Sequence, residues 1–126
     1  MVIFQLPADL RMHARYALIH KWENRYDIQS ISIHEFSEKM VAAIFDGTWL
    51  SSMKYLEEPS ILLVDDLNLL VDRDTVQEIF YSTVIKPRLE KKRLTVLFTE
   101  KGYDEFSFLL RDDLRNLLRL GLHTPD

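Results

Sequence analysis

The 126-residue chain contains no cysteine, which excludes a disulfide scaffold, thiolate zinc ligands and a cysteine nucleophile. Glycine is also scarce, with three residues in all. No apolar run approaches the length of a membrane span, and the first residues lack the layout of a signal peptide, so a cytoplasmic protein is expected. The net charge of −4 argues against a protein that mainly coats nucleic acid.

Short apolar runs alternate with helical patterns along the whole chain. This alternation predicts a single α/β domain over residues 1–126, built as a three-layer αβα sandwich with a mainly parallel sheet of four to five strands. The run 61–64 is apolar at every position, which is typical of a central strand buried on both faces. The other strands are expected at 2–4, 27–33, 94–99 and, at an edge, 120–124.

The expected helices cover 8–23, a segment from Ser32 or His34 to Gly47, then 48–57, 75–92, 103–110 and 112–120. Asp72 or Asp74 is expected to cap helix 75–92, and Pro87 should kink it. The spacing of apolar residues selects the buried faces. The residues expected to be buried are Leu10, Ala14, Ala17 and Leu18 in the first helix and Phe36, Met40, Val41 and Ile44 in the second. In helix 48–57 they are Trp49, Leu50, Met53 and Leu56, and in helix 75–92 they are Val76, Ile79, Phe80 and Ile85.

Two adjacent carboxylates, Asp65 and Asp66, directly follow the central strand. Carboxylates at the end of a buried strand are costly unless a partner neutralises them. Ligands of parallel α/β folds bind at the carboxyl ends of the strands, where Thr99 also ends a strand. A magnesium nucleotide is therefore one candidate for this edge. The alternative is that Asp66 caps the next turn or pairs with a nearby cation.

Three stretches carry a family resemblance: "SIHEFSEKMVAAI", "WLSSMKYLEEPSILLVDDLNLL" and "TVQEIFYSTVIKPRLEKKRLTVLFTEKGYDEF". In order and spacing they resemble the AAA+ ATPase core of the DnaA replication initiator and of the DnaC/DnaI-type helicase loaders. The resemblance covers almost the whole chain. It implies that Asp65 and Asp66 are the Walker B acids and that Thr99 lies in the sensor-1 region. A receiver domain also has an acidic pair after a strand, but there it follows the first strand.

The resemblance places the family's phosphate loop, GxxxxGK[ST], on residues 6–13. Leu6 and Arg11 stand at the two glycines, Met12 at the lysine and His13 at the magnesium-binding hydroxyl. Without these groups the backbone cannot wrap a phosphate with its amides exposed. The resemblance therefore implies a degenerate phosphate loop, with Asp65 and Asp66 as vestigial acids and with no catalytic residue, cofactor or metal.

Further departures from the family pattern lie near the C-terminus. Lys101 takes the place of the polar sensor-1 residue, and Leu117 falls at the arginine-finger position. The chain ends before the segment that forms the family's helical lid, so no lid is expected. Arg111, Arg115 and Arg119 recur every four residues and should share one helix face, which is the candidate partner-binding surface.

These features predict a non-catalytic, DnaA-like interaction module that binds or regulates a replication initiator or a helicase loader. The expected partner is a DnaA-type or helicase-loader ATPase, or a second copy of the chain. Two other functions stay open. One is a nucleotide-binding AAA+ subunit with a site rebuilt around Asp65, Asp66 and Thr99. The other is a DNA-binding initiator fragment, with weak binding at most, that uses the basic cluster Arg88, Lys91, Lys92 and Arg93.

Overall fold

The computed structural model describes residues 1–48, 51, 54–100, 110–119 and 122–123. Their strands form one parallel sheet in the order β2-β3-β4-β1-β5. The strands are β1 (Val2–Gln5), β2 (Ile28–Ser32), β3 (Ile61–Asp65), β4 (Leu94–Thr99) and β5 (Leu122–His123). All five predicted strands are therefore present, and the edge strand β5 pairs with β1.

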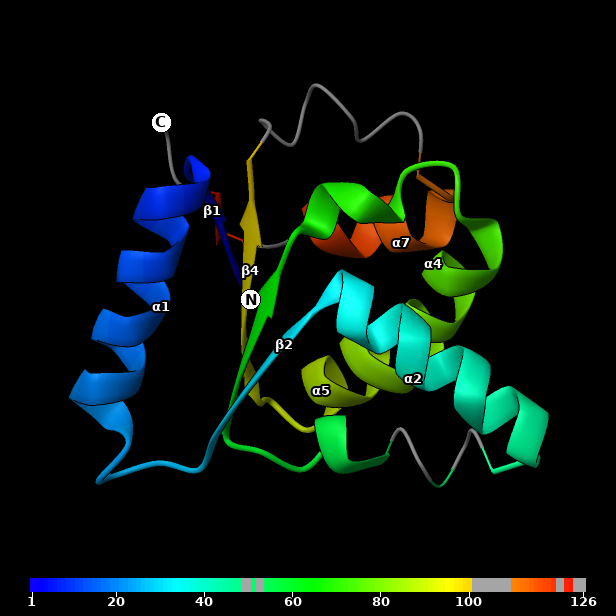
Figure 1. The fold of residues 1–126 in the computed structure, drawn as a ribbon, viewed down its shortest axis with the longest axis horizontal. Helices are drawn as coiled ribbons and strands as arrows, with labels where there is room; N and C mark the ends of the chain where they lie inside the picture. The colour runs from blue at the N-terminus through cyan, green and yellow to red at the C-terminus, as the bar shows by residue number, and fades with distance from the viewer. Residues whose placement is uncertain (49–50, 52–53, 101–109, 120–121, 124–126) are drawn as a thin grey trace.

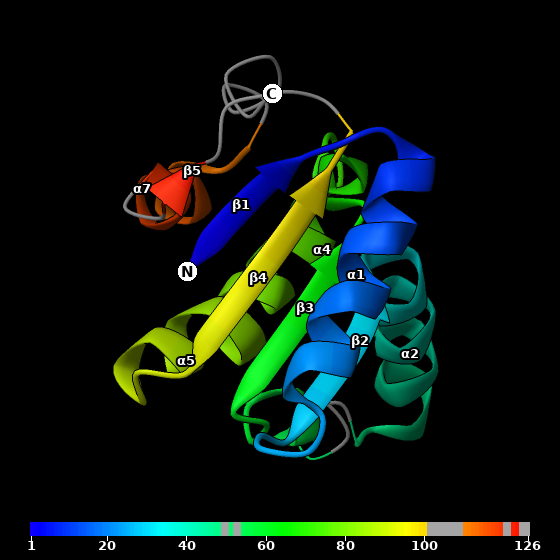
Figure 2. The ribbon, with the colours of Figure 1, turned by 90° about the vertical axis from the view of Figure 1, so that its left-hand side faces the viewer.

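Helices cover the sheet on both faces, which confirms the predicted αβα sandwich (Figures 1 and 2). On one face lies α1 (Ala8–Trp22). The other face carries α2 (Ile33–Asp46), α4 (Asp74–Phe80), α5 (Lys86–Glu90) and α7 (Asp112–Arg119). Because both faces are covered, all five residues of β3 are buried, as expected for a central parallel strand. No described helix is long and apolar enough to cross a membrane.

A capping box begins α2. The Ser32 hydroxyl accepts a hydrogen bond from the Glu35 amide, and the Glu35 side chain accepts one from the Ser32 amide. Ser32, rather than His34, is thus the cap, and Gly47 ends the helix with a left-handed φ of 70°. Phe36 and Met40 are buried as predicted, but the prediction for Val41 and Ile44 is wrong, since both are 46% exposed.

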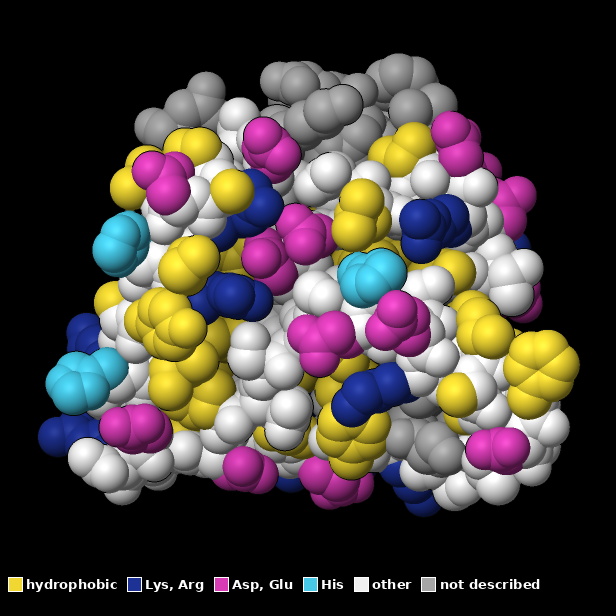
Figure 3. Space-filling view, viewed as in Figure 1, with side chains coloured by type: hydrophobic (Ala, Val, Ile, Leu, Met, Phe, Trp, Pro, Cys, Tyr) yellow, Lys and Arg dark blue, Asp and Glu magenta, His cyan; other side chains and the backbone are white. Residues whose placement is uncertain are grey.

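Hydrophobic side chains gather on the surface at the right of Figure 3, over the end of α2, where Phe45 is 86% exposed beside Val41 and Ile44. Ala43 fills the inward position instead. The helix is turned so that its narrow buried stripe follows Phe36, Met40 and Ala43, which are spaced four and three residues apart. The apolar residues of α2 cover a wider face of the helix than the face that is buried, so Val41 and Ile44 remain partly exposed.

The buried face of α1 also differs from the predicted one. Ala14 and Leu18 pack against the sheet as expected, whereas Leu10 is 49% exposed and Ala17 also faces outward. Arg11 is the buried residue of the first turn. The inward face of α1 therefore contains Arg11, Ala14 and Leu18, and its first turn presents a charged side chain to the sheet.

The predicted helix 75–92 is present but is not uniform. It consists of α4, a π-helical segment η3 (Tyr81–Ile85) and α5, and it ends at Glu90. Pro87 lacks an amide and its ring would crowd the carbonyl four residues earlier, so the π turn just before it is the expected disturbance. The predicted caps are wrong: Arg73 is the N-cap, Asp72 has a φ of 61°, and Asp74 is the first helical residue.

Two predicted helices lie partly outside the described residues. Of 48–57, the structure describes a 3₁₀ helix, η1 (Lys54–Leu56), whose Leu56 is fully buried; Trp49, Leu50 and Met53 lie outside the description. Of 103–110, only the buried Leu110 is described. A further 3₁₀ helix, η2 (Leu67–Leu70), follows β3 and was not predicted.

Arg88 does not belong to an accessible basic cluster with Lys91, Lys92 and Arg93, because its side chain is 0% exposed. Its guanidinium donates to the carbonyls of Leu56, Pro59 and Leu94 at 3.1, 2.7 and 2.8 Å and to the Thr95 hydroxyl at 2.8 Å. Burial, followed by the charge of Arg93, lowers the pKa of Arg88 to about 10. Arg88 therefore stays charged at neutral pH and ties the loop before β3 to the start of β4.

Replacing Arg88 by Met should lower the free energy of unfolding by about 3 kcal/mol or more, since each buried carbonyl left without a donor costs about 1–3 kcal/mol. Urea denaturation followed by circular dichroism measures the change. Lys86→Met is the matched control, because Lys86 is an exposed cation on the same helix. Equal effects of the two substitutions would contradict the structural role of Arg88.

Candidate functional site

The candidate site lies where the central strands end. Asp65 is the last residue of β3, Asp66 follows it, and Thr99 is the last residue of β4. Thr99 is buried and its hydroxyl lies 3.4 Å from the Asn68 side-chain oxygen, on the turn that follows Asp66. The sequence thus correctly placed these three residues at the carboxyl edge of the sheet.

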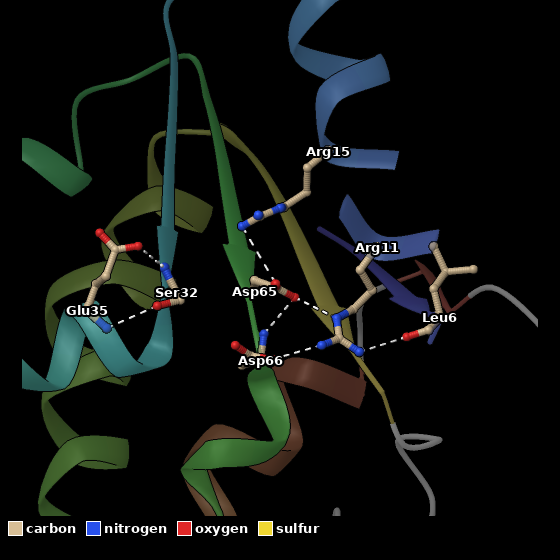
Figure 4. Close-up of polar contacts among 7 residues, drawn as sticks. All are labelled: Leu6, Arg11, Arg15, Ser32, Glu35, Asp65 and Asp66. Carbon is tan, nitrogen blue, oxygen red and sulfur yellow. Dashed lines mark hydrogen bonds and ion pairs between the residues drawn. The ribbon is translucent and has the colours of Figure 1, made fainter. Parts of the chain in front are cut away.

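Arg11 fills the space between the two carboxylates and the end of β1 (Figure 4). Its Nε lies 2.9 Å from Asp65 Oδ1, one terminal nitrogen lies 3.0 Å from Asp66 Oδ1, and the other donates to the Leu6 carbonyl at 2.9 Å. Arg15, one turn later on α1, reaches the second oxygen of Asp65 at 3.6 Å. Each nitrogen of the Arg11 guanidinium therefore has a partner.

The burial of this cluster makes its pairing important. Arg11 is 6% exposed and Asp65 is 9% exposed. Charges removed from water are costly unless they are paired and hydrogen-bonded, and the planar guanidinium can satisfy two carboxylates and a carbonyl at once. The two acids thus have an internal cation as their partner, one of the two roles weighed for Asp66.

The other role weighed for Asp66 is capping of the next turn. Asp66 does occupy the N-cap position of η2, with a left-handed φ of 60°, but its side chain makes no capping hydrogen bond. Instead, the Asp66 amide donates to Asp65 Oδ1 at 2.9 Å. Partial burial, followed by the neighbouring charge of Asp65, raises the pKa of Asp66, and the two arginines only partly offset this. Ionisation of Asp66 is therefore less favourable here than ionisation of a free aspartate.

The connection from β1 to α1 is short. Only Leu6 and Pro7 separate the two elements, so residues 8–13 are helical. The Leu6 amide donates to the Thr99 carbonyl and the Arg11 amide to the Pro7 carbonyl, both at 2.9 Å. Met12 is 52% exposed, and His13 is also exposed. The segment that the resemblance aligns with a phosphate loop is therefore a closed turn and a helix.

Among the described residues, no group of three or more His, Asp or Glu side chains could hold a metal ion. Asp65 and Asp66 come together, but the cation that they meet is Arg11. Magnesium prefers carboxylates together with substrate phosphates as ligands. At this edge both carboxylates are already engaged with guanidinium groups.

The three candidate docking arginines are placed differently from one another. Arg111 precedes α7 and lies 3.5 Å from a Glu78 oxygen and 3.6 Å from an Asp113 oxygen. Arg115 pairs with Asp112, and Arg119 is exposed at the end of the helix. Leu114 and Leu118 of the same helix are buried. Whether this surface binds a partner stays a prediction, while Lys101 and the side chain of Leu117 fall outside the described part of the chain.

Sequence reasoning missed two polar contributors. Arg15 was not singled out, although its place one turn after Arg11 puts both cations on one helix face. Gln77 is 0% exposed; it donates to the Leu70 carbonyl at 2.6 Å and accepts from the Arg111 amide at 2.7 Å. A lone glutamine within an amphipathic helix carries no signal of such a role.

The strand order, the helices on both faces and the acidic end of β3 define an AAA+ type of nucleoside-triphosphatase core. The sequence model of the bacterial DnaA ATPase domain matches residues 10–125. The chain belongs to this family.

Solved structures support the same fold. The replication initiator DnaA bound to AMPPCP and single-stranded DNA superposes with a TM-score of 0.86 at 18% identity. AMPPCP-bound DnaA from Aquifex aeolicus gives 0.83 at 16%, and domain III of DnaA from Thermotoga maritima gives 0.79 at 17%. Each match covers 98% of this chain but only 39%, 39% and 52% of those chains, respectively.

The contacts predict unequal costs for neutralising the two acids. Asp65→Asn should lower the free energy of unfolding by about 3 kcal/mol or more, because it leaves buried Arg11 without its main counter-charge. Asp66→Asn should cost less than about 1 kcal/mol, since the Asp66 side chain is 33% exposed. Urea denaturation of both variants measures the difference. A larger loss for Asp66→Asn would contradict this assignment.

The pKa of Asp66 also predicts a pH effect. In the folded chain the pKa of Asp66 lies above its ordinary value of 3.8. At a pH between these two pKa values, Asp66 is therefore protonated in the folded chain and ionised in the unfolded chain. The free energy of unfolding of the wild type, relative to Asp66→Asn, should therefore rise as the pH falls through the folded value and level off below 3.8. Parallel urea titrations of the two proteins test this, and a difference that falls instead would show a lowered pKa.

Proposed function

We propose that this chain is a non-catalytic, DnaA-like AAA+ module that acts through protein contacts in the cytoplasm and does not use ATP. The observation that carries the proposal is the Arg11 guanidinium, which binds both Asp65 and Asp66. In this role the two acids maintain the fold. They do not position magnesium or activate water.

Binding a magnesium nucleotide at this edge would require several changes at once. Arg11 would have to leave both carboxylates, and the first turn of α1 would have to unwind to expose amides. Breaking a buried ion pair by removing one partner costs about 3–5 kcal/mol. Met12 and His13 offer no replacement for the lysine and the hydroxyl of the phosphate loop, because a methionine side chain carries no positive charge and a histidine side chain has no hydroxyl. These costs favour a core that is stable without nucleotide.

Isothermal titration calorimetry with ATP and magnesium tests the loss of the nucleotide site. Each charge-assisted phosphate contact contributes about 1.5–3 kcal/mol, so loss of three should leave a dissociation constant in the millimolar range or weaker. Micromolar, magnesium-dependent binding that Asp66→Asn abolishes would support the alternative, a site rebuilt around Asp65, Asp66 and Thr99. ATP hydrolysis abolished by the same substitution would do so as well.

The charge distribution bears on the partner. Asp9, Asp65 and Asp66 would form an acidic side for head-to-tail contact with a family ATPase or with a second copy. Arg11 and Arg15 already pair with Asp65 and Asp66, so this acidic side offers a partner less charge. On the basic side Arg111 and Arg115 also have carboxylate partners, while Arg119 is exposed at the end of α7. A DnaA-type ATPase that offers acidic groups of its own is therefore the proposed partner.

Reversing two charges tests the docking surface. Arg115→Glu with Arg119→Glu should abolish association with a DnaA-type ATPase, because like charges across an interface cost several kcal/mol. Biolayer interferometry measures association, and circular dichroism checks the fold. Lys21→Glu is the matched control, because Lys21 is exposed on α1, across the sheet from α7. Unchanged association of a folded double variant would place the docking surface elsewhere.

A further inference from the structure

A groove lies at the opposite, amino edge of the sheet, where β3 and β4 begin. Its volume is about 380 Å³, within the range of about 300–1,000 Å³ typical of small-ligand pockets. Trp22, the last residue of α1, and Tyr26, in the following loop, form its aromatic side. Lys92 and Arg93, from the turn between α5 and β4, form its cationic side. Figure 1 shows the α1–β2 and α5–β4 connections at this same end of the sheet.

The cationic side is fixed in place by its backbone. Lys92 has a left-handed φ of 57°. The Arg93 amide donates to the Arg88 carbonyl at 2.8 Å, and the Leu94 amide to the Ser60 carbonyl at 3.2 Å. A non-glycine residue at positive φ is held there only by its surroundings. The turn therefore presents Lys92 and Arg93 in one defined arrangement.

These cations lack counter-charges in the described part of the chain. Lys91 is paired with Glu57 at 2.8 Å and with Glu58 at 3.5 Å, but no described carboxylate pairs with Lys92 or Arg93. The Nε of Arg93 is buried and has no hydrogen-bond partner among the described groups. An anion in the groove would supply the counter-charge that Lys92 and Arg93 lack among the described carboxylates.

Arg88 adds to the positive charge at this edge. Its guanidinium donates to the carbonyls of Ser60 and Leu94, which line the groove, and all its described partners are neutral oxygens. Arg88 and Arg93 are thus two cations of this edge without a carboxylate among their described partners, and the charge of Arg93 acts on Arg88. An anion beside Arg93 would be attracted by both.

The aromatic side selects the remainder of the ligand. Tyr26 is 50% exposed, and Trp22 is partly buried against the core on the α1 face. Exposed aromatic rings beside cations suit a planar ring that carries a phosphate, because the ring stacks while the cations bind the phosphate. An acidic peptide would use the cations but leave the aromatic surface exposed.

We propose that this groove binds a nucleotide unit, with its ring against Tyr26 and Trp22 and its phosphate on Lys92 and Arg93. The unit is either a free nucleoside monophosphate or one residue of a single strand. Binding needs no magnesium, and the site is separate from the carboxyl edge that holds Asp65 and Asp66.

Nuclear magnetic resonance titration of the full chain without magnesium tests the proposal, with AMP and hexathymidylate as probes. AMP should shift the amide signals of Tyr26, Lys92 and Arg93 in a saturable way. Ribose 5-phosphate and adenosine, which each lack half of the unit, should bind at least about tenfold more weakly. Tighter binding of hexathymidylate than of AMP would identify a single strand as the source of the unit, and the reverse would identify the free nucleotide.

Two variants and one control locate the site. Lys92→Asn with Arg93→Gln should weaken AMP binding about tenfold or more, and asparagine tolerates the left-handed backbone at position 92. Tyr26→Ala, at an exposed position, tests the ring contact even if the double variant fails to fold. Arg25→Gln is the matched control, since Arg25 is an exposed cation in the same loop but is not part of the lining.

Several results would overturn the proposal. Among them are AMP shifts confined to Asp65 and Asp66, and equal binding of ribose 5-phosphate and AMP. Unchanged affinity in folded groove variants, or a hexaglutamate peptide that binds as tightly as AMP, would do so as well. Loss of binding in Arg25→Gln to the same extent would show a general charge effect rather than a site.

Discussion

The ion pair between Arg11 and Asp65 determines how α1 sits on the sheet. It turns the helix so that Arg11, Ala14 and Leu18 face inward, and it leaves Leu10 and Met12 exposed. It also closes the turn after β1, because the same guanidinium binds the Leu6 carbonyl. The positive charge between the end of β3 and the start of α1 is therefore supplied by the chain itself.

Each end of the sheet is stabilised by the guanidinium of a buried arginine, but the two ends differ in charge. Arg11 satisfies two carboxylates at the carboxyl edge, whereas Arg88 satisfies backbone carbonyls near the amino edge. Because the first set is acidic and the second is neutral, the carboxyl edge is compensated and the amino edge keeps its positive charge. This asymmetry makes the amino edge the better place for an external anion.

The sequence predicted the strands, the sandwich and the position of Asp65 and Asp66 well, because strand periodicity and a buried acidic pair are local signals. It did not predict the partners of the buried arginines. The sequence groups Arg88 with Lys91, Lys92 and Arg93 in one basic cluster, and only the tertiary contact with the loop before β3 distinguishes it from Lys91. The caps expected at Asp72 and Asp74 failed for a similar reason, since backbone angles set by the preceding turn decided them.

If the chain does not use ATP, as proposed, Arg11 is the permanent partner of Asp65 and Asp66. Its Nε–H can be observed directly by nuclear magnetic resonance of the labelled chain, with Arg11→Lys used to assign the signal. We expect one Nε–H signal, protected from exchange with solvent at neutral pH, because this group is buried against Asp65. Addition of ATP and magnesium should leave it unchanged. A signal that exchanges rapidly, or that shifts and loses protection when ATP and magnesium are added, would contradict the account.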